Sequence, residues 1–273
     1  MVASADIRQL CWVVPEMTKS ADSLVVEEVS SECQNGICTI SFSHPKGNSL
    51  PSALLGRLAG EIRGAAHDVK VRVIVLKSGG EGPFCGGASF DELRTLSTFD
   101  EAREFFLGFA RVILALVNCP KLTIARVHGK VVGGGIGLVA ACDYSLAVIS
   151  ADARLSELDL GIGPFVIGPC VTRRIGVSRF STMAIGTAWH SAQWCFDAGL
   201  YSAIVSNDGQ LDAEVGLLAS RLVTRSSDAM KQLKEMLWKD SSELNTLLPA
   251  QAEVSARLLL SDHCQQIFAQ QKR

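Results

Sequence analysis

Residues 131–143 have the sequence VVGGGIGLVAACD, in which two apolar residues lead into three glycines and a run of small side chains. Glycines allow a tight turn and leave backbone N–H groups open to a ligand. The positive end of a helix starting here would strengthen the field at those N–H groups. The pattern therefore predicts a strand, a turn and a helix that bind either a phosphate or a developing oxyanion.

A second glycine-rich stretch, PFCGGASFDEL at residues 83–93, follows the strand-like segment VRVIVL at 71–76. It lies about 47 residues before the first stretch, and each of the two loops comes directly after a predicted strand. Bare backbone amides in both loops could point at one atom. We expect the two loops to form a single site.

The glycines also allow two other interpretations. Gly135, Gly137 and Ala140 fit a relaxed dinucleotide-binding fingerprint, with Glu157 22 residues beyond the first of them. Against this reading, the match lies in the middle of the chain and no series of βαβ units follows it. The glycines could also serve only close packing of a helix on a strand. Motifs for serine hydrolases, Walker-type nucleotide binding and HExxH metalloproteases are absent.

Composition limits the class of protein. The chain has 273 residues, of which 48% are hydrophobic and 20% charged, which excludes a disordered protein. A net charge of −2 without a basic block argues against nucleic acid as a partner. The longest apolar run, residues 131–142, is too short to span a membrane, so we expect no membrane association.

Nine cysteines are scattered along the chain, and no C-x-x-C pair occurs. Metal-ligand spacing is therefore missing, and we expect no metal. In a chain of this size the cysteines are interpreted as small buried apolar residues in a reducing compartment. The N-terminus lacks a secretory signal, so a cytoplasmic location is expected.

The order of elements predicts one α/β domain. Strand-like segments flank the hairpin turn at 34–36, and helices are expected at 52–68 and 99–118, with further strands at 71–78, 122–127 and 144–150. We divide the chain into an N-terminal extension (1–22), a core (23–206) and a C-terminal helical region (207–273).

Three motifs, in order, resemble the enoyl-CoA hydratase/isomerase (crotonase) superfamily. They are FCGGASF at 84–90, GGGIGLVAACD at 133–143 and LSELDLGIGPFVIGPCVTRRIG at 155–176, the last matching the family's E-x-x-x-G-x-x-P pattern. The resemblance implies a crotonase-like α/β fold of repeated ββα units that form a spiral core. It also implies a C-terminal helical region used for trimerisation, and hence a homotrimer or a dimer of trimers.

By the same resemblance, the amides of Ala88 and Gly134 form an oxyanion hole for a thioester carbonyl, and Glu157 is the general acid/base. Asp159 is the reserve candidate for that role. The substrate-binding positions implied by the motifs are Cys85, Gly86, Phe90 and Gly137. No cofactor is implied beyond the coenzyme A of the substrate thioester.

Gly137 departs from the family pattern, because the well-studied hydratases have a glutamate at this position. The chain therefore resembles a single-glutamate branch that includes enzymes of 3-methylglutaconyl-type thioesters. We place an enoyl-CoA hydratase or dehydratase ahead of an enoyl-CoA delta-isomerase, which needs one base only. A crotonase-fold oligomer without catalysis is the remaining alternative.

A second departure concerns the carrier of the acyl group. The family's first loop commonly has a lysine for coenzyme A, whereas this chain has Ala88, Ser89, Phe90 and Asp91 there. Lys231 or Lys234 could supply the charge, although a solvated helix face is the expected role of both. The expected partner is therefore an acyl-CoA or an acyl-carrier-protein thioester.

Overall fold

The structure, a computed structural model, describes residues 27–239 and 241–270. The predicted N-terminal extension (1–22) lies outside the described residues. The chain forms a six-stranded main sheet in the order β1-β2-β3-β4-β6-β8, where only β1 runs antiparallel to its neighbour. Its strands are β1 (Glu28–Gln34), β2 (Ile37–Ser43), β3 (Val73–Ser78), β4 (Leu122–Val127), β6 (Tyr144–Val148) and β8 (Ala203–Val205).

A second, smaller layer contains β5 (Val131–Val132) and β7 (Ala153–Arg154) as a parallel pair. Isolated parallel bridges join Leu50 to Ala88 and Cys85 to Val131. Each of β2, β3, β4 and β6 is thus followed by a short extended segment that leaves the main sheet and joins this second layer. This repetition is the predicted ββα unit, and it places both glycine loops side by side in the second layer.

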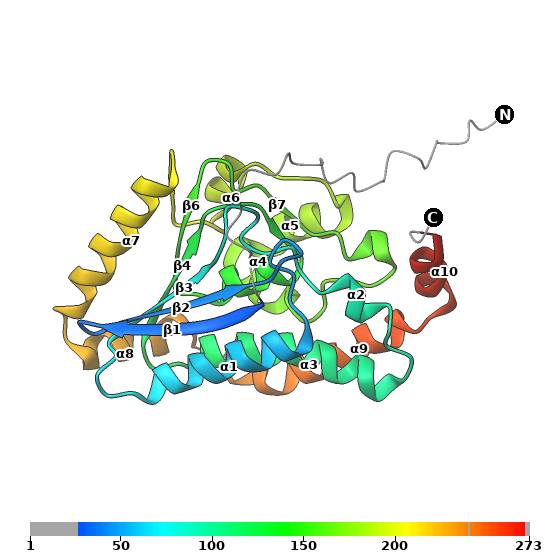
Figure 1. Cartoon of the computed structure of the whole chain (residues 1–273), viewed down its shortest axis with the longest axis horizontal. Coiled ribbons are helices and arrows are strands. Elements are labelled where there is room, and N and C mark those ends of the chain that lie inside the picture. Colours follow the sequence, from blue (N-terminus) through cyan, green and yellow to red (C-terminus); the bar gives the residue numbers. More distant parts are fainter. Residues whose placement is uncertain (1–26, 240, 271–273) are drawn as a thin grey trace.

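Helices surround the two layers (Figure 1). They are α1 (Ser52–His67), α2 (Phe90–Leu93), α3 (Phe99–Val117), α4 (Gly134–Ala141), α5 (Gly168–Gly186), α6 (Ala192–Ala198), α7 (Asp208–Val223), α8 (Ser227–Leu237), α9 (Leu244–Leu259) and α10 (Asp262–Gln270), with 3₁₀ turns η2 (Leu158–Leu160) and η3 (Ser241–Glu243). None of the helices in the described part of the chain is long and apolar enough to cross a membrane.

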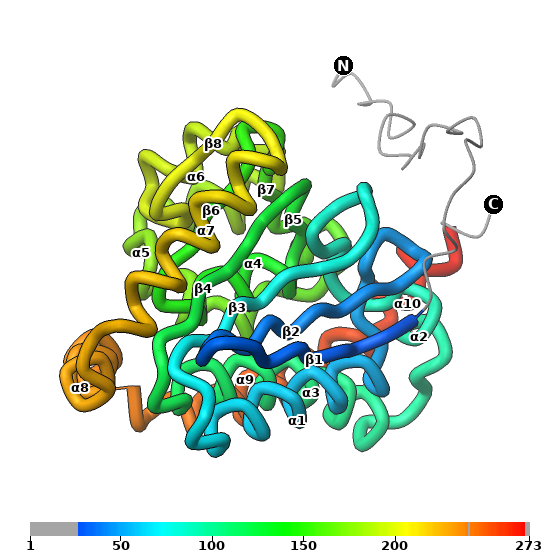
Figure 2. The backbone as a smooth tube through the Cα atoms, turned by 60° about the vertical axis from the view of Figure 1, so that its left-hand side comes forward, coloured from blue at the N-terminus to red at the C-terminus, as the bar shows by residue number. Residues whose placement is uncertain are grey.

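Helix α3 is central to the packing because it contacts both α1 and α9 (Figure 2). It starts at a capping box, in which the Thr98 side chain accepts from the Glu101 amide and the Glu101 carboxylate accepts from the Thr98 amide. It ends shortly before Pro120, as the sequence predicts. Residues 102–117 supply twelve buried positions, among them Phe106 and Phe109. The C-terminal helix α9 therefore packs on the core and reaches the same region as the glycine loops.

Two features differ from the sequence prediction. The strand-like segment that the sequence predicts before the hairpin turn is LVVEEV at 24–29, and its residues 24–26 lie outside the described residues. The strand β1 continues to Gln34, because the polar residues up to the turn also pair with β2. The turn itself is as predicted, with positive φ at both Asn35 and Gly36. Helices α5 and α6 are absent from the prediction.

The cysteine interpretation needs one correction. Cys33 and Cys38 face each other across the β1–β2 hairpin with Cα atoms 4.0 Å apart, and they form a disulfide. The expectation that the cysteines are buried apolar thiols is therefore wrong for this pair, because their spacing around a tight turn makes them direct cross-strand neighbours. It is confirmed for six others, which are free and buried: Cys85, Cys119, Cys142, Cys170, Cys195 and Cys264.

Candidate active site

The two glycine loops meet in the second layer, as the sequence predicts. The Val132 amide donates to the Cys85 carbonyl (2.8 Å), and the Cys85 amide donates to the Lys130 carbonyl (3.3 Å). Gly87 has φ +88°, and a Cβ on it would lie 3.2 Å from the Val132 carbonyl oxygen. Only glycine fits both the conformation and the close approach of these loops.

The Ala88 and Gly134 amides are free to serve a ligand in this arrangement. Leu50 donates to the Gly87 carbonyl (2.8 Å) and accepts from Ser89 (3.2 Å), so the Ala88 N–H between them points the other way. Gly134 is the first residue of α4, where amides have no partner within the helix. A Cβ on Gly134 would lie 2.2 Å from Cε1 of Phe109, so the Phe109 ring leaves no room for a side chain at this position.

Ala88 and Gly134 both line one cavity of about 60 Å³. Its walls come from the two glycine loops, from Phe106 and Phe109 of α3, from Leu160 and residues 162–167, and from Ser255 of α9. Gly86 and Phe90, two of the predicted substrate-binding residues, are among them. The wall is apolar apart from the backbone amides, Glu157 and two serines. An acyl group fits such surroundings better than a phosphate.

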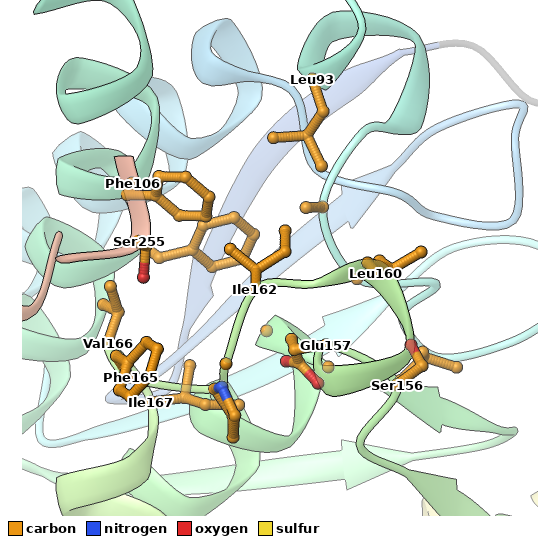
Figure 3. A pocket seen from close by; sticks show the side chains of 18 of the residues that line it. Leu93, Phe106, Ser156, Glu157, Leu160, Ile162, Phe165, Val166, Ile167 and Ser255 are labelled. Atoms are coloured by element: carbon orange, nitrogen blue, oxygen red, sulfur yellow. The ribbon is translucent and has the colours of Figure 1, made fainter. Parts of the chain in front are cut away.

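Among the described residues that line the cavity, only Glu157 has a carboxyl group (Figure 3). Its Oε2 is shut off from solvent and has no hydrogen-bond partner among the described residues. Its Oε1 is 2.9 Å from where a Cβ on Gly133 would stand, so the carboxyl group lies against the glycine turn that carries the Gly134 amide. Burial raises the pKa of Glu157 to about 7, although the backbone amides of Ser156 and Glu157 oppose the shift. A carboxyl group with this pKa can both accept and donate a proton at neutral pH.

Asp159, the reserve candidate, lies outside the cavity lining. Its carboxylate pairs with Arg154 (2.7 Å) and accepts from the Thr187 hydroxyl (2.9 Å). These contacts give it a structural role.

Cys85 and Gly137, also predicted to bind substrate, stand behind the cavity wall. Cys85 is fully buried against Gly135, and burial raises the pKa of its thiol to about 12. A Cβ on Gly137 would lie 2.4 Å from Cγ2 of Ile167, so Ile167 fills the space that a side chain at 137 would need. Neither residue is among those that line the cavity, so a role for them in substrate binding stays a prediction.

A sequence model described as enoyl-CoA hydratase/isomerase matches residues 32–268, most of the chain. The chain belongs to this family. It is 31% identical over 197 residues to the mitochondrial methylglutaconyl-CoA hydratase of Homo sapiens, covering 71% of this chain and 58% of that protein. It is 28% identical over 205 residues to the bacillaene synthase dehydratase PksH of Bacillus subtilis, covering 75% of this chain and 76% of that one.

A solved structure of an enoyl-CoA hydratase from Bacillus halodurans superposes on the chain with a TM-score of 0.83 at 22% identity. It covers 89% of this chain and 99% of its own, which confirms the crotonase fold. The chain spans about three-fifths of the length of the methylglutaconyl-CoA hydratases it matches.

Family membership and geometry together overturn the dinucleotide interpretation. A Cβ on Gly135 would lie 2.6 Å from Cβ of Cys85, and Gly137 is covered by Ile167. No pyrophosphate can approach these glycines, which instead allow α4 to pack closely. The part of the chain at 27–239 and 241–270 contains no group of three or more His, Cys, Asp or Glu side chains placed to hold a metal ion.

Of the two lysines considered for the thioester carrier, Lys234 departs from the expected solvated helix face and Lys231 does not. Lys234 is 2% exposed and donates to the carbonyls of Leu116 (2.8 Å) and Lys121 (2.9 Å), so it is neither a solvated residue nor a carrier contact. Lys231 is exposed and lies 3.9 Å from Glu235 on its own helix.

The sequence analysis missed two cations that lie beside the glycine loop at 83–93. Lys46 pairs with Asp91, and the Arg94 guanidinium lies 6.0 Å from the centre of the Phe90 ring. Lys46 belongs to the loop between β2 and α1, whose Gly47 carbonyl accepts from the Gly86 amide (2.9 Å). The sequence HPKG at 44–47, directly after a predicted strand, was the available signal.

Proposed function

We propose that this protein is a hydratase or dehydratase of enoyl thioesters. The amides of Ala88 and Gly134 bind the thioester carbonyl oxygen, and Glu157 is the general acid/base. The observation that supports this proposal most is the Glu157 carboxyl group, whose Oε2 has no hydrogen-bond partner among the described residues and which lines the same apolar cavity as Ala88 and Gly134. The names of the hydratase and dehydratase relatives support the same reaction class.

The two amides would withdraw electrons through the thioester oxygen and make the β-carbon open to attack. In hydration, the Glu157 carboxylate accepts a proton from water while the water oxygen bonds to the β-carbon. The electrons of the double bond move toward the thioester oxygen as an enolate, which the amides stabilise. Glu157 then returns the proton to the α-carbon. Losing one oxyanion donor costs about 3 kcal/mol of transition-state stabilisation in comparable sites.

Coenzyme A is the proposed carrier of the acyl group. Lys46 and Arg94 are cations beside the loop that carries Ala88 and Phe90, where they could attract phosphates. An acyl-carrier protein presents the same thioester, so the two carriers are compared directly with one acyl group. The substitution Lys46→Ala should weaken binding of the CoA thioester more than binding of the corresponding pantetheine thioester, which lacks the nucleotide.

The test is hydration of crotonyl-CoA, followed by loss of absorbance at the enoyl-thioester band. We expect Glu157→Gln to lose at least about a hundredfold in kcat, a typical contribution of general acid–base catalysis. The matched control is Asp159→Asn, which changes a carboxylate two residues away that lies outside the cavity lining. If both variants hydrate crotonyl-CoA like the wild type, the assignment of Glu157 is wrong.

One observation favours the isomerase as a second candidate. Ile167 fills the space beside Gly137, so the family's other glutamate has no counterpart here. A single carboxylate suffices to move a proton between two carbons of an enolate. Conversion of a 3-enoyl-CoA to the 2-enoyl isomer, without hydration of crotonyl-CoA, would establish the isomerase. The absence of both reactions would leave a non-catalytic member of the fold.

We also propose that the chain assembles as a homotrimer or a dimer of trimers through its C-terminal helices. Helix α8 exposes Leu233 (43%), Met236 (65%) and Leu237 (44%), an apolar stripe at helical spacing. Sedimentation velocity should give a mass of three or six chains, and a monomer would refute the assembly.

A further inference from the structure

The side chains of the cavity wall carry almost no charge. Between residues 27 and 239 and between 241 and 270, no lysine, arginine or histidine lines the cavity, and Glu157 is its one ionisable side chain. The polar side chains on the wall are Glu157, Ser156 and Ser255. The wall can therefore bind apolar atoms and an uncharged polar group, but it has no cation for a second carboxylate.

Of the three polar side chains on the cavity wall, Ser255 is the one farthest in sequence from the two glycine loops. It lies on α9 and is 1% exposed. Figure 3 places it between Phe106 and Val166, across the cavity from Ser156 and Leu160. Its position fits contact with the acyl group at a distance from the oxyanion amides.

The Ser255 hydroxyl has no hydrogen-bond partner among the described residues. Helical serines and threonines commonly bond the carbonyl of the preceding turn, as Ser181 does to Val177 (2.9 Å) and Thr182 to Ser178 (3.1 Å). Ser255 makes no such bond. Because Ser255 lines the cavity, its hydroxyl is available to form a hydrogen bond with a ligand oxygen there.

The charged neighbours of Ser255 on α9 are satisfied elsewhere. Glu253 accepts from Arg103 of α3 (3.2 Å) and from Arg257 (3.2 Å), and the Arg257 guanidinium lies over the Phe99 ring. These contacts fix α9 against α3 and keep both cations out of the cavity wall. Neither arginine can neutralise an anion beside Ser255 without giving up these partners.

We propose that Ser255 is a specificity-determining residue, and that the acyl site selects uncharged acyl groups carrying a hydrogen-bonding oxygen over acyl groups with a free carboxylate. The proposal rests on the proposed function, because it assumes that the cavity binds an acyl thioester. The proposal therefore predicts weak binding of thioesters of the methylglutaconyl type, because their acyl group carries a free carboxylate.

The physical reason is the cost of burying an unpaired anion. A carboxylate that enters an apolar site without a cation loses its hydration and gains no compensating charge. Glu157 would add repulsion whenever it is ionised. An uncharged carbonyl or hydroxyl oxygen loses less on burial and regains a hydrogen bond from Ser255.

The test compares binding of three saturated five-carbon thioesters at pH 8, pentanoyl-CoA, 4-oxopentanoyl-CoA and glutaryl-CoA, by calorimetry. None of the three can be hydrated, so the measurement does not depend on turnover. In the wild type, the oxo compound should bind about three- to tenfold more tightly than pentanoyl-CoA, the size of one neutral hydrogen bond. Glutaryl-CoA should bind at least about a hundredfold more weakly than pentanoyl-CoA.

Ser255→Ala should abolish the preference for the oxo compound and leave pentanoyl-CoA binding within about twofold, because alanine is well tolerated in a helix. The matched control is Thr246→Ala, which removes an exposed hydroxyl from the same helix and should keep the wild-type order. Equal binding of glutaryl-CoA and pentanoyl-CoA, or an unchanged preference in Ser255→Ala, overturns the proposal.

The outcome is separable from that of the proposed function. If the binding order is as expected but crotonyl-CoA is neither hydrated nor isomerised, the reaction is wrong and the specificity holds. If hydration occurs but the order fails, the specificity is wrong and the reaction holds. If none of the three thioesters binds, the cavity is not an acyl site and both proposals fail.

Discussion

Helix α4 has a buried carboxyl group near each end, and the two differ in their hydrogen-bond and ion-pair partners. At the C-terminal end, Asp143 is fully supplied with donors. Its Oδ2 accepts from the Thr123 amide (2.7 Å) and hydroxyl (2.9 Å) and pairs with Lys234 (2.9 Å), and its Oδ1 accepts from the Trp238 indole (2.8 Å). At the N-terminal end, the Oε2 of Glu157 has no partner among the described residues.

The helix dipole helps to explain the difference. The C-terminal end of a helix is partly negative, so an anion at Asp143 needs the compensating charge of Lys234. The N-terminal end is partly positive and favours an anion, whether a carboxylate or a thioester oxygen. The paired carboxylate joins the C-terminal helices to the core, whereas the unpaired one remains available to exchange a proton. A buried carboxyl group without partners is therefore the better marker of the candidate active site.

The largest effect should come from breaking the paired end. Lys234→Met leaves Asp143 buried without its cation, and we expect a loss of about 3–5 kcal/mol in the free energy of unfolding. Urea denaturation at pH 7 measures this loss. The control on the same helix is Lys231→Met, whose exposed ion pair with Glu235 should contribute less than about 1 kcal/mol.

A second substitution makes this prediction sharper. Asp143→Asn in the Lys234→Met background removes the unpaired charge but keeps an oxygen acceptor, so part of the lost stability should return. Equal stability of Lys234→Met and Lys231→Met would mean that the buried pair is not what holds this end of α4.

The comparison also indicates how far the sequence predicts the fold. The helix at 52–67, the hairpin at Asn35-Gly36 and the glycine turn before α4 all have strong local signals, and they are confirmed. Helix α5 has no such signal, because the hydrophobicity of its sequence shows little helical periodicity and Gly176 interrupts it with φ +79°. Its conformation depends on tertiary packing that periodicity does not report.

The candidate site was predictable where backbone chemistry defines it. Glycine motifs pointed to the two loops, and the motif with Glu157 supplied the carboxyl group. Ser255 and the burial of Lys234 depend on where the C-terminal helices dock, about 120 residues along the chain from the glycine loops. A weak signal for Lys234 existed, since it lies one helical turn from the buried Met230 and shares its face.

A stability effect of intermediate size is expected at Gly137 in the middle of α4, the position at which the well-studied hydratases have their second glutamate. Gly137→Ala places a Cβ 2.4 Å from Cγ2 of Ile167. We expect a loss of about 1–3 kcal/mol by overpacking, partly offset by the better helix propensity of alanine. Thermal denaturation of Gly137→Ala, Ile167→Ala and the double variant provides the test. The double variant should be more stable than the sum of the single effects predicts, and strict additivity would show that Ile167 does not exclude a side chain at 137.

The smallest effect should come from removing the unpaired carboxyl group, and its sign should depend on pH. The pKa of Glu157 is raised to about 7 from an ordinary 4.5, so the folded chain holds this proton more tightly than the unfolded chain. The contribution of this protonated group to the free energy of unfolding is fully present below about pH 4.5 and is lost as the pH rises toward 7.

The Glu157→Gln variant cannot ionise at this position. Its free energy of unfolding relative to that of the wild type should therefore rise between pH 4.5 and 7 and stay constant above pH 7. The full shift corresponds to roughly 3 kcal/mol, but the carboxyl group lines a cavity that has room for water, and the higher effective dielectric constant of such a site should reduce the difference to about 1 kcal/mol. Urea denaturation of both proteins from pH 4.5 to 8 measures the difference, and a constant offset would mean that Glu157 is as well paired as Asp143.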